Sequence, residues 1–190
     1  MTMPNNIGLL KNEERRLLQG PGENENIGGL GTIRYIIHCN GNASLVLKRS
    51  KDVLLKVNRA FQERFPEEEE WYSLLPDYFV YSCRPDVPLE QSQKEVELDR
   101  KLLNCLSLED RGIWCDLERW HLSSWIYWFQ EENRYWYWWD SYVHENSHIF
   151  VAIEVHEWPY PSGNLSWLFR GCGAYSVKES EKKSTHVQRF

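Results

Sequence analysis

The pattern of apolar and polar residues along this chain of 190 residues predicts both strands and helices. Runs that are rich in β-branched and aromatic residues indicate strands. The clearest run, at residues 149–158, has a continuously apolar first half and an alternating second half, as in a buried strand. We expect strands at residues 32–39, 43–48, 77–84, 120–129, 134–139 and 149–158.

Apolar residues at intervals of three and four positions predict the helices. We expect them at residues 9–18, 50–65, 89–108 and 165–172. Asn40-Gly41-Asn42 separates the first two predicted strands and is typical of a hairpin turn. The elements together predict an α+β fold with a mainly antiparallel sheet of five or six strands. Helices 50–65 and 89–108 are expected to cover one face of this sheet, and a short helix lies near the C-terminus.

The length favours a single domain, since typical domains have roughly 100–200 residues. Residues 1–31 are predicted to form a short helix and a flexible loop rich in glycine. Residues 32–177 are predicted to form the α+β domain. Residues 178–190 are rich in Lys, Glu and Ser, so we expect a poorly ordered tail.

Six of the ten tryptophans lie between residues 120 and 140. We interpret this stretch as a hairpin of two aromatic strands with its turn at residues 131–133. Both faces of the hairpin would be apolar, while the expected helices cover one face. The rings either form the core, as such rings usually do, or the second face binds a partner through Trp, Tyr and Arg. The second interpretation predicts the binding residues Trp125, Trp128, Arg134, Trp136, Trp138, Trp139, Asp140 and Glu154.

The formal net charge of −6 argues against a nucleic-acid partner, because a protein that binds phosphates without sequence preference needs a cationic surface. No apolar run approaches the roughly 20 residues that span a bilayer, so no membrane partner is expected. The five cysteines are widely spaced, and the N-terminus lacks the pattern of a secretory signal. We therefore expect a cytoplasmic protein with reduced thiols.

The segment His144-Glu145-Asn146-Ser147-His148 matches the motif H-E-x-x-H and in these five residues resembles zinc peptidases. In those enzymes the motif lies on a helix, both imidazoles bind zinc, and the glutamate activates the metal-bound water. Here Asn146 and Ser147 favour a turn. A zinc hydrolase with Glu145 as its base is therefore kept as an alternative. Its metal ligands would be His144, His148 and Glu154.

The leading hypothesis is a non-enzymatic, acidic intracellular protein that needs no cofactor and holds a protein partner on an aromatic sheet surface. It rests on the net charge, the aromatic stretch and the lack of a P-loop, a dinucleotide fingerprint or a nucleophile elbow. In type, such a protein is similar to the small bacterial immunity proteins that neutralise toxins. Besides the zinc hydrolase, a small-ligand pocket between sheet and helices is a further alternative.

Overall fold

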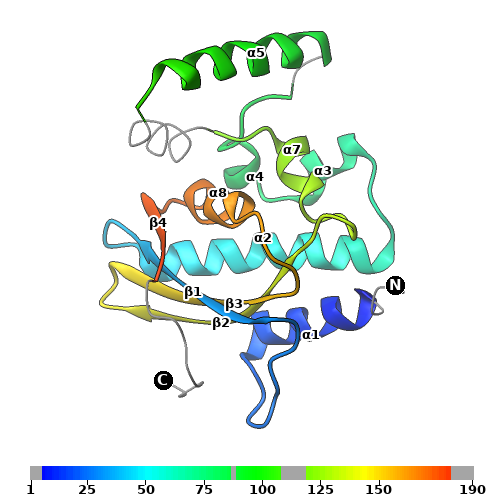
Figure 1. Cartoon of the computed structure of the whole chain (residues 1–190). Helices are drawn as coiled ribbons and strands as arrows, with labels where there is room; N and C mark the ends of the chain where they lie inside the picture. Colours follow the sequence, from blue (N-terminus) through cyan, green and yellow to red (C-terminus); the bar gives the residue numbers. More distant parts are fainter. Residues whose placement is uncertain (1–5, 87–88, 108–118, 181–190) are drawn as a thin grey trace.

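The computed structural model describes residues 6–86, 89–107 and 119–180, and in these parts the fold is α+β (Figure 1). Four strands form one antiparallel sheet in the order β2-β3-β1-β4. The predicted fold class is confirmed, with fewer strands than expected. The strands are β1 (Gly31–His38), β2 (Trp136–His144), β3 (His148–Val155) and β4 (Ser176–Glu179).

Seven α-helices lie in the described parts of the chain, and none of them is long and apolar enough to cross a membrane. A short 3-10 helix, η1 (Glu68–Glu70), precedes α3. The helices are α1 (Asn6–Gln19), α2 (Ala43–Glu63), α3 (Trp71–Leu74), α4 (Asp77–Val80), α5 (Leu89–Cys105), α7 (Leu122–Tyr127) and α8 (Gly163–Gly171).

The core lies between the sheet and α2, which crosses one face of the sheet (Figure 1). Alternate residues of β3 point into it, among them Ile149 and Ile153. From α2, Val46, Val53 and Val57 meet them, because their spacing of seven and four residues places them on one side of the helix. The helix α8 packs against α2 at the same side of the sheet.

The predicted strand 120–129 is wrong, because this segment forms α7. Its buried residues are Leu122, Trp125, Ile126 and Phe129, which recur at the helical intervals of three and four. The aromatic hairpin therefore does not exist. The strand predicted at residues 134–139 does form, but it pairs with β3 instead of its preceding neighbour.

Two further predicted strands, at residues 43–48 and 77–84, are also wrong. The turn Asn40-Gly41-Asn42 does end β1, but the chain then enters α2, whose first six residues had been predicted as a returning strand. The second segment contains α4, which follows Pro76 and has Asp77 in its first turn. A proline before the helix and an acidic residue in its first turn are both signals of a helix start.

The helices predicted at residues 9–18, 89–108 and 165–172 are confirmed as α1, α5 and α8, although residue 108 is outside the described residues. The expected position of α5 on the sheet is wrong, since Figure 1 shows it at the far end of the molecule from the sheet. Its side chain Glu95 reaches Arg84 at 3.3 Å, and its apolar residue Val96 is exposed.

The C-terminal part of the described chain adds β4, which the sequence pattern does not predict. This strand pairs with β1 and ends at Glu179, so it includes the first residues of the predicted tail. Residues 181–190 lie outside the described residues.

Candidate functional site

The sheet face that points away from α2, called the outer face below, carries every second side chain of each strand. The pairing of the strands places these side chains in rows across the sheet. One row contains Tyr142, Phe150, Ile36 and Lys178, from β2, β3, β1 and β4 in that order. Figure 1 shows α2 and α8 on the opposite side of the sheet from this face.

The N-terminal segment covers one end of the outer face, at Glu154. The carboxylate of Glu154 is buried, and it accepts a hydrogen bond from Arg16 Nη1 at 2.6 Å. His156 Nε2 lies 3.2 Å from it. Gly28 lies so close that a β-carbon on it would stand 2.4 Å from Glu154 Oε1. Burial alone would raise the pKa of Glu154, but the hydrogen bonds from His156 and Arg16 hold this pKa below its ordinary value.

Arg16 also ties the loop that follows α1 to the edge strand β2. Its guanidinium pairs with Glu25 at 2.7 Å and lies 4.2 Å above the ring of Trp139. Burial opposes ionisation of Glu25, but the Gly22 N–H and two arginines stabilise the carboxylate and lower its pKa to about 2. The predicted binding residues Trp139 and Glu154 are therefore occupied within the protein.

The other half of the outer face presents an aromatic pair. The rings of Tyr142 and Phe150 are stacked, with their centres 4.9 Å apart and their planes 5° from parallel. Both side chains are half-buried, as is Ile36 on the neighbouring strand. In the described residues, no helix lies over this part of the sheet (Figure 1). An apolar stripe is thus left accessible beside the covered end.

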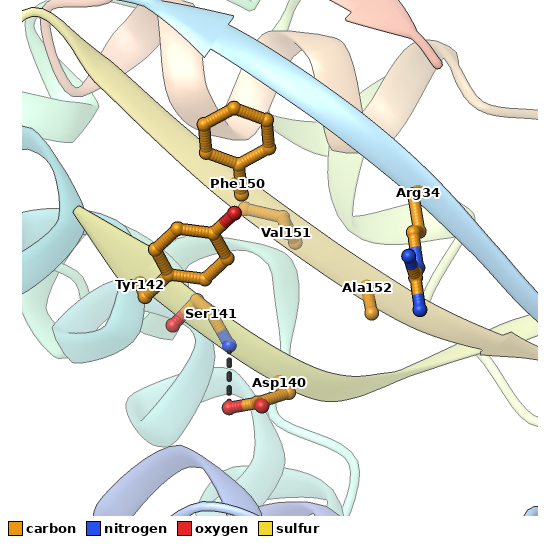
Figure 2. A pocket seen from close by; sticks show the side chains of 7 residues that line it. All are labelled: Arg34, Asp140, Ser141, Tyr142, Phe150, Val151 and Ala152. Carbon is orange, nitrogen blue, oxygen red and sulfur yellow. Dashed lines mark hydrogen bonds between the residues drawn. The ribbon is translucent and has the colours of Figure 1, made fainter. Parts of the chain in front are cut away.

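A small hollow of about 20 Å³ lies next to the aromatic pair, as Figure 2 shows. Arg34 of β1 and Asp140 of β2 stand on opposite sides of it, with Ala152 of β3 between them. Asp140 Oδ1 accepts the backbone N–H of Ser141 at 2.7 Å. The apolar stripe is therefore bordered by side chains of both charges.

The H-E-x-x-H segment lies at the end of this face and forms a hairpin turn, not a helix. His144 ends β2 and His148 begins β3, so the two residues pair across the hairpin. Glu145 and Asn146 occupy the turn with φ values of 51° and 47°, and the Glu145 side chain is exposed.

His38 extends the pair to a row of three histidines across the sheet, because it is the partner of His148 on β1. The rings of His38 and His148 are 4.9 Å apart and edge to face. Burial lowers the pKa of His38, and the nearby His148 and Lys178 lower it further.

The alternative zinc ligands are not brought together. Glu154 follows His148 by six residues on the same strand, a distance of about 20 Å. Within the described residues, no three or more His, Cys, Asp or Glu side chains are grouped so that they could hold a metal ion.

Most of the predicted binding residues belong to the core. Trp125, Trp136 and Trp138 are fully buried, Arg134 is buried, and Trp128 is half-buried. Asn164 accepts the indole N–H groups of two of these residues inside the core, at 2.8 Å through its backbone oxygen and at 2.9 Å through its side chain. Their burial corrects the prediction of an exposed tryptophan surface, and Asp140 alone of the predicted set borders the open stripe.

The accessible pair Tyr142 and Phe150 was not among the predicted residues. The continuously apolar start of β3 predicts burial on both faces of the sheet, so the sequence pattern alone does not predict that Phe150 is accessible. The signal that identifies the pair is the register of the hairpin. Residues 142 and 150 stand equally far from the turn that Asn146 centres.

Comparisons of this chain with protein-family models, with curated proteins and with solved structures found no match.

Proposed function

We propose that this protein is a non-enzymatic binding protein that holds a protein partner on the open half of the outer face. The stacked pair Tyr142 and Phe150, together with Ile36, carries the proposal. Aromatic residues contribute much of the energy of protein interfaces because they bury a large area with few rotatable bonds. An apolar stripe on a sheet face that no helix of the described residues covers supports the same use.

The shape of the site favours a protein over a free small ligand. The hollow beside the stripe has a volume of about 20 Å³, whereas small-molecule pockets usually have about 300–1,000 Å³. Arg34, Asp140 and Lys178 border the stripe, as the polar rim of an interface does around its apolar centre.

The overall charge and the cysteines agree with the proposal. A net charge of −6 speeds the encounter with a basic partner. The described cysteines 39, 83, 105 and 172 are free thiols, which supports the expected cytoplasmic location.

The test is photo-crosslinking from the stripe. A benzophenone amino acid is placed at position 142, and the protein is exposed to a lysate of its source cells. The control carries the same group at Tyr81, which is 78% exposed and lies beside α4, away from the sheet. We expect one prominent adduct from position 142 and none of the same mass from position 81.

A second substitution links the adduct to the stripe. Phe150→Ala removes the stacked ring, and we expect it to reduce the adduct from position 142 at least about tenfold, as loss of an interface hot spot does. An equal yield of the adduct from both positions, or an adduct that survives Phe150→Ala, would refute the proposal. An adduct of twice the chain mass would show that the stripe binds a second copy of this chain instead of another protein.

A further inference from the structure

A second, larger hollow lies on the α2 side of the sheet, between the end of α2, η1, α3 and α7. Its volume is about 130 Å³, which is below the roughly 300–1,000 Å³ of small-molecule pockets. Three aromatic residues and two carboxylates line it, and none of the residues that line it is basic. These residues are Phe65, Trp71, Tyr127, Glu68 and Asp86, and we call the site the acidic hollow.

Trp71 lines the acidic hollow and carries a buried hydrogen-bond donor. Its side chain is 2% exposed, and its indole N–H has no hydrogen-bond partner among the described residues. By contrast, Trp125 and Trp136 donate their indole N–H groups to Asn164. A buried donor without a partner costs about 1–3 kcal/mol, so an acceptor supplied by a ligand would be favourable here.

Asp86 brings a fixed negative charge. Its carboxylate accepts the hydroxyl of Ser123 at 2.6 Å and the hydroxyl of Tyr72. Burial and the hydrogen bond to Asp86 together raise the pKa of Tyr72 to about 12, so Tyr72 remains a donor at neutral pH. His121 Nδ1 stands 3.8 Å from Asp86 Oδ1. The exposed Glu68 adds a second carboxylate at the hollow.

The opening of the acidic hollow is aromatic and accessible. Phe65 is 48% exposed and Tyr127 is 49% exposed. A cation near the face of such a ring gains about 0.5–2 kcal/mol, more as water is removed. Two carboxylates beside these rings make the site complementary to a positive charge on an apolar stem.

We propose that the acidic hollow binds an Arg or Lys side chain presented by a peptide segment. The cation lies between the aromatic rings of Phe65 and Tyr127 and the carboxylates of Glu68 and Asp86. A carbonyl of the same peptide accepts the indole N–H of Trp71. This site uses other residues than the outer face, so it stands or falls independently of the proposed function.

The test is a titration followed by ¹H–¹⁵N NMR of the indole N–H groups, with the peak of Trp71 assigned from Trp71→Phe. The probes are acetyl-Gly-Arg-Gly-amide and the same peptide with citrulline, which keeps the shape of arginine without its charge. We expect the arginine peptide to shift the Trp71 peak with a dissociation constant on the order of 1 mM. The citrulline peptide is expected to bind at least about tenfold more weakly.

Two matched variants distinguish binding in the acidic hollow from a general attraction to the negative charge of the protein. Glu68→Gln removes a carboxylate that lines the hollow, and Glu69→Gln removes its exposed neighbour in η1, which does not line it. We expect Glu68→Gln to weaken the binding of the arginine peptide about threefold to tenfold. Glu69→Gln is expected to change the dissociation constant of this peptide by less than about twofold. Equal effects of the two variants, equal shifts with arginine and citrulline, or no shift of Trp71 would each overturn the proposal. Phe150→Ala, on the outer face, should leave the titration unchanged.

Discussion

Glu13 offers a sharp test of how α1 is held against the sheet. Its carboxylate is completely buried. It accepts the backbone N–H of Trp138 at 2.7 Å, the amide of Asn58 at 2.8 Å and the guanidinium of Arg134. Arg134 is itself buried and lies 4.6 Å from the centre of the Tyr137 ring. One carboxylate thus joins α1, α2 and the edge strand β2.

Glu13→Ala should be strongly destabilising, because it leaves the Arg134 guanidinium buried without its carboxylate. Removing one partner of a buried ion pair costs about 3–5 kcal/mol. We expect the free energy of unfolding to fall by that amount. The double variant Glu13→Ala/Arg134→Met should lose less stability than the sum of the losses in the two single variants. In the double variant both charges are removed, so no unpaired charge remains buried.

The control is Glu14→Ala on the next position of α1. Glu14 pairs with Arg59, but both side chains are accessible to solvent. Such a pair contributes about 1 kcal/mol or less. The comparison therefore isolates the effect of burial from that of helix sequence and charge.

The assay is urea unfolding followed by tryptophan fluorescence, repeated across pH. Burial raises the pKa of Glu13, and Arg134→Met removes the cation that opposes this shift most, leaving only the weaker effect of Arg16. The folded state of that variant then binds the proton more tightly than the unfolded chain does. Its stability should fall as the pH rises above the ordinary value of 4.5. The reasoning is refuted if Glu13→Ala costs no more than Glu14→Ala.

Three further predictions concern the loop after α1 and the core. Gly28→Ala should lower the free energy of unfolding by about 1–3 kcal/mol, because the new β-carbon clashes with the Glu154 carboxylate. Gly8→Ala has open space around the new β-carbon, so its free energy of unfolding in a urea titration should be unchanged or higher. Because the pKa of Glu25 lies near 2, the stability difference between wild type and Glu25→Gln should be full above pH 4.5 and disappear as the pH falls from 4.5 to 2; a pH-independent difference would contradict this. Asn164→Ala should cost about 1–3 kcal/mol in thermal unfolding because an indole loses its acceptor, and Asn164→Asp, which keeps the oxygen, should cost less.

The helical segments show where periodicity was sufficient and where it was misread. α1 and α8 were predictable because their apolar residues follow helical spacing and glycine ends each segment. The spacing of Leu122, Trp125, Ile126 and Phe129 is equally helical, but the density of aromatic residues favoured a strand by propensity. Strand propensity depends on the surroundings, and here burial between other helices decided the conformation.

The candidate sites were less predictable than the elements. Asn146 and Ser147 were correctly expected to lie in a turn, but the pairing of His144 and His148 across it, and of His148 with His38, required the order of the strands. The acidic hollow joins Trp71, Asp86 and Tyr127, which lie up to 56 positions apart in the sequence. Nothing in the local pattern around any of them indicates the others.

The sequence alone determined the α+β class, most helices, the strands β1 to β3 and the acidic charge, because these follow from local periodicity, propensity and composition. Only the tertiary structure decided which aromatic rings are accessible. A ring becomes core or surface according to what packs over it, and that depends on segments far away in the chain. Trp138 is buried against α8 and α2, through Phe169 and Lys51, while Phe150, on the opposite face of the same sheet, remains accessible.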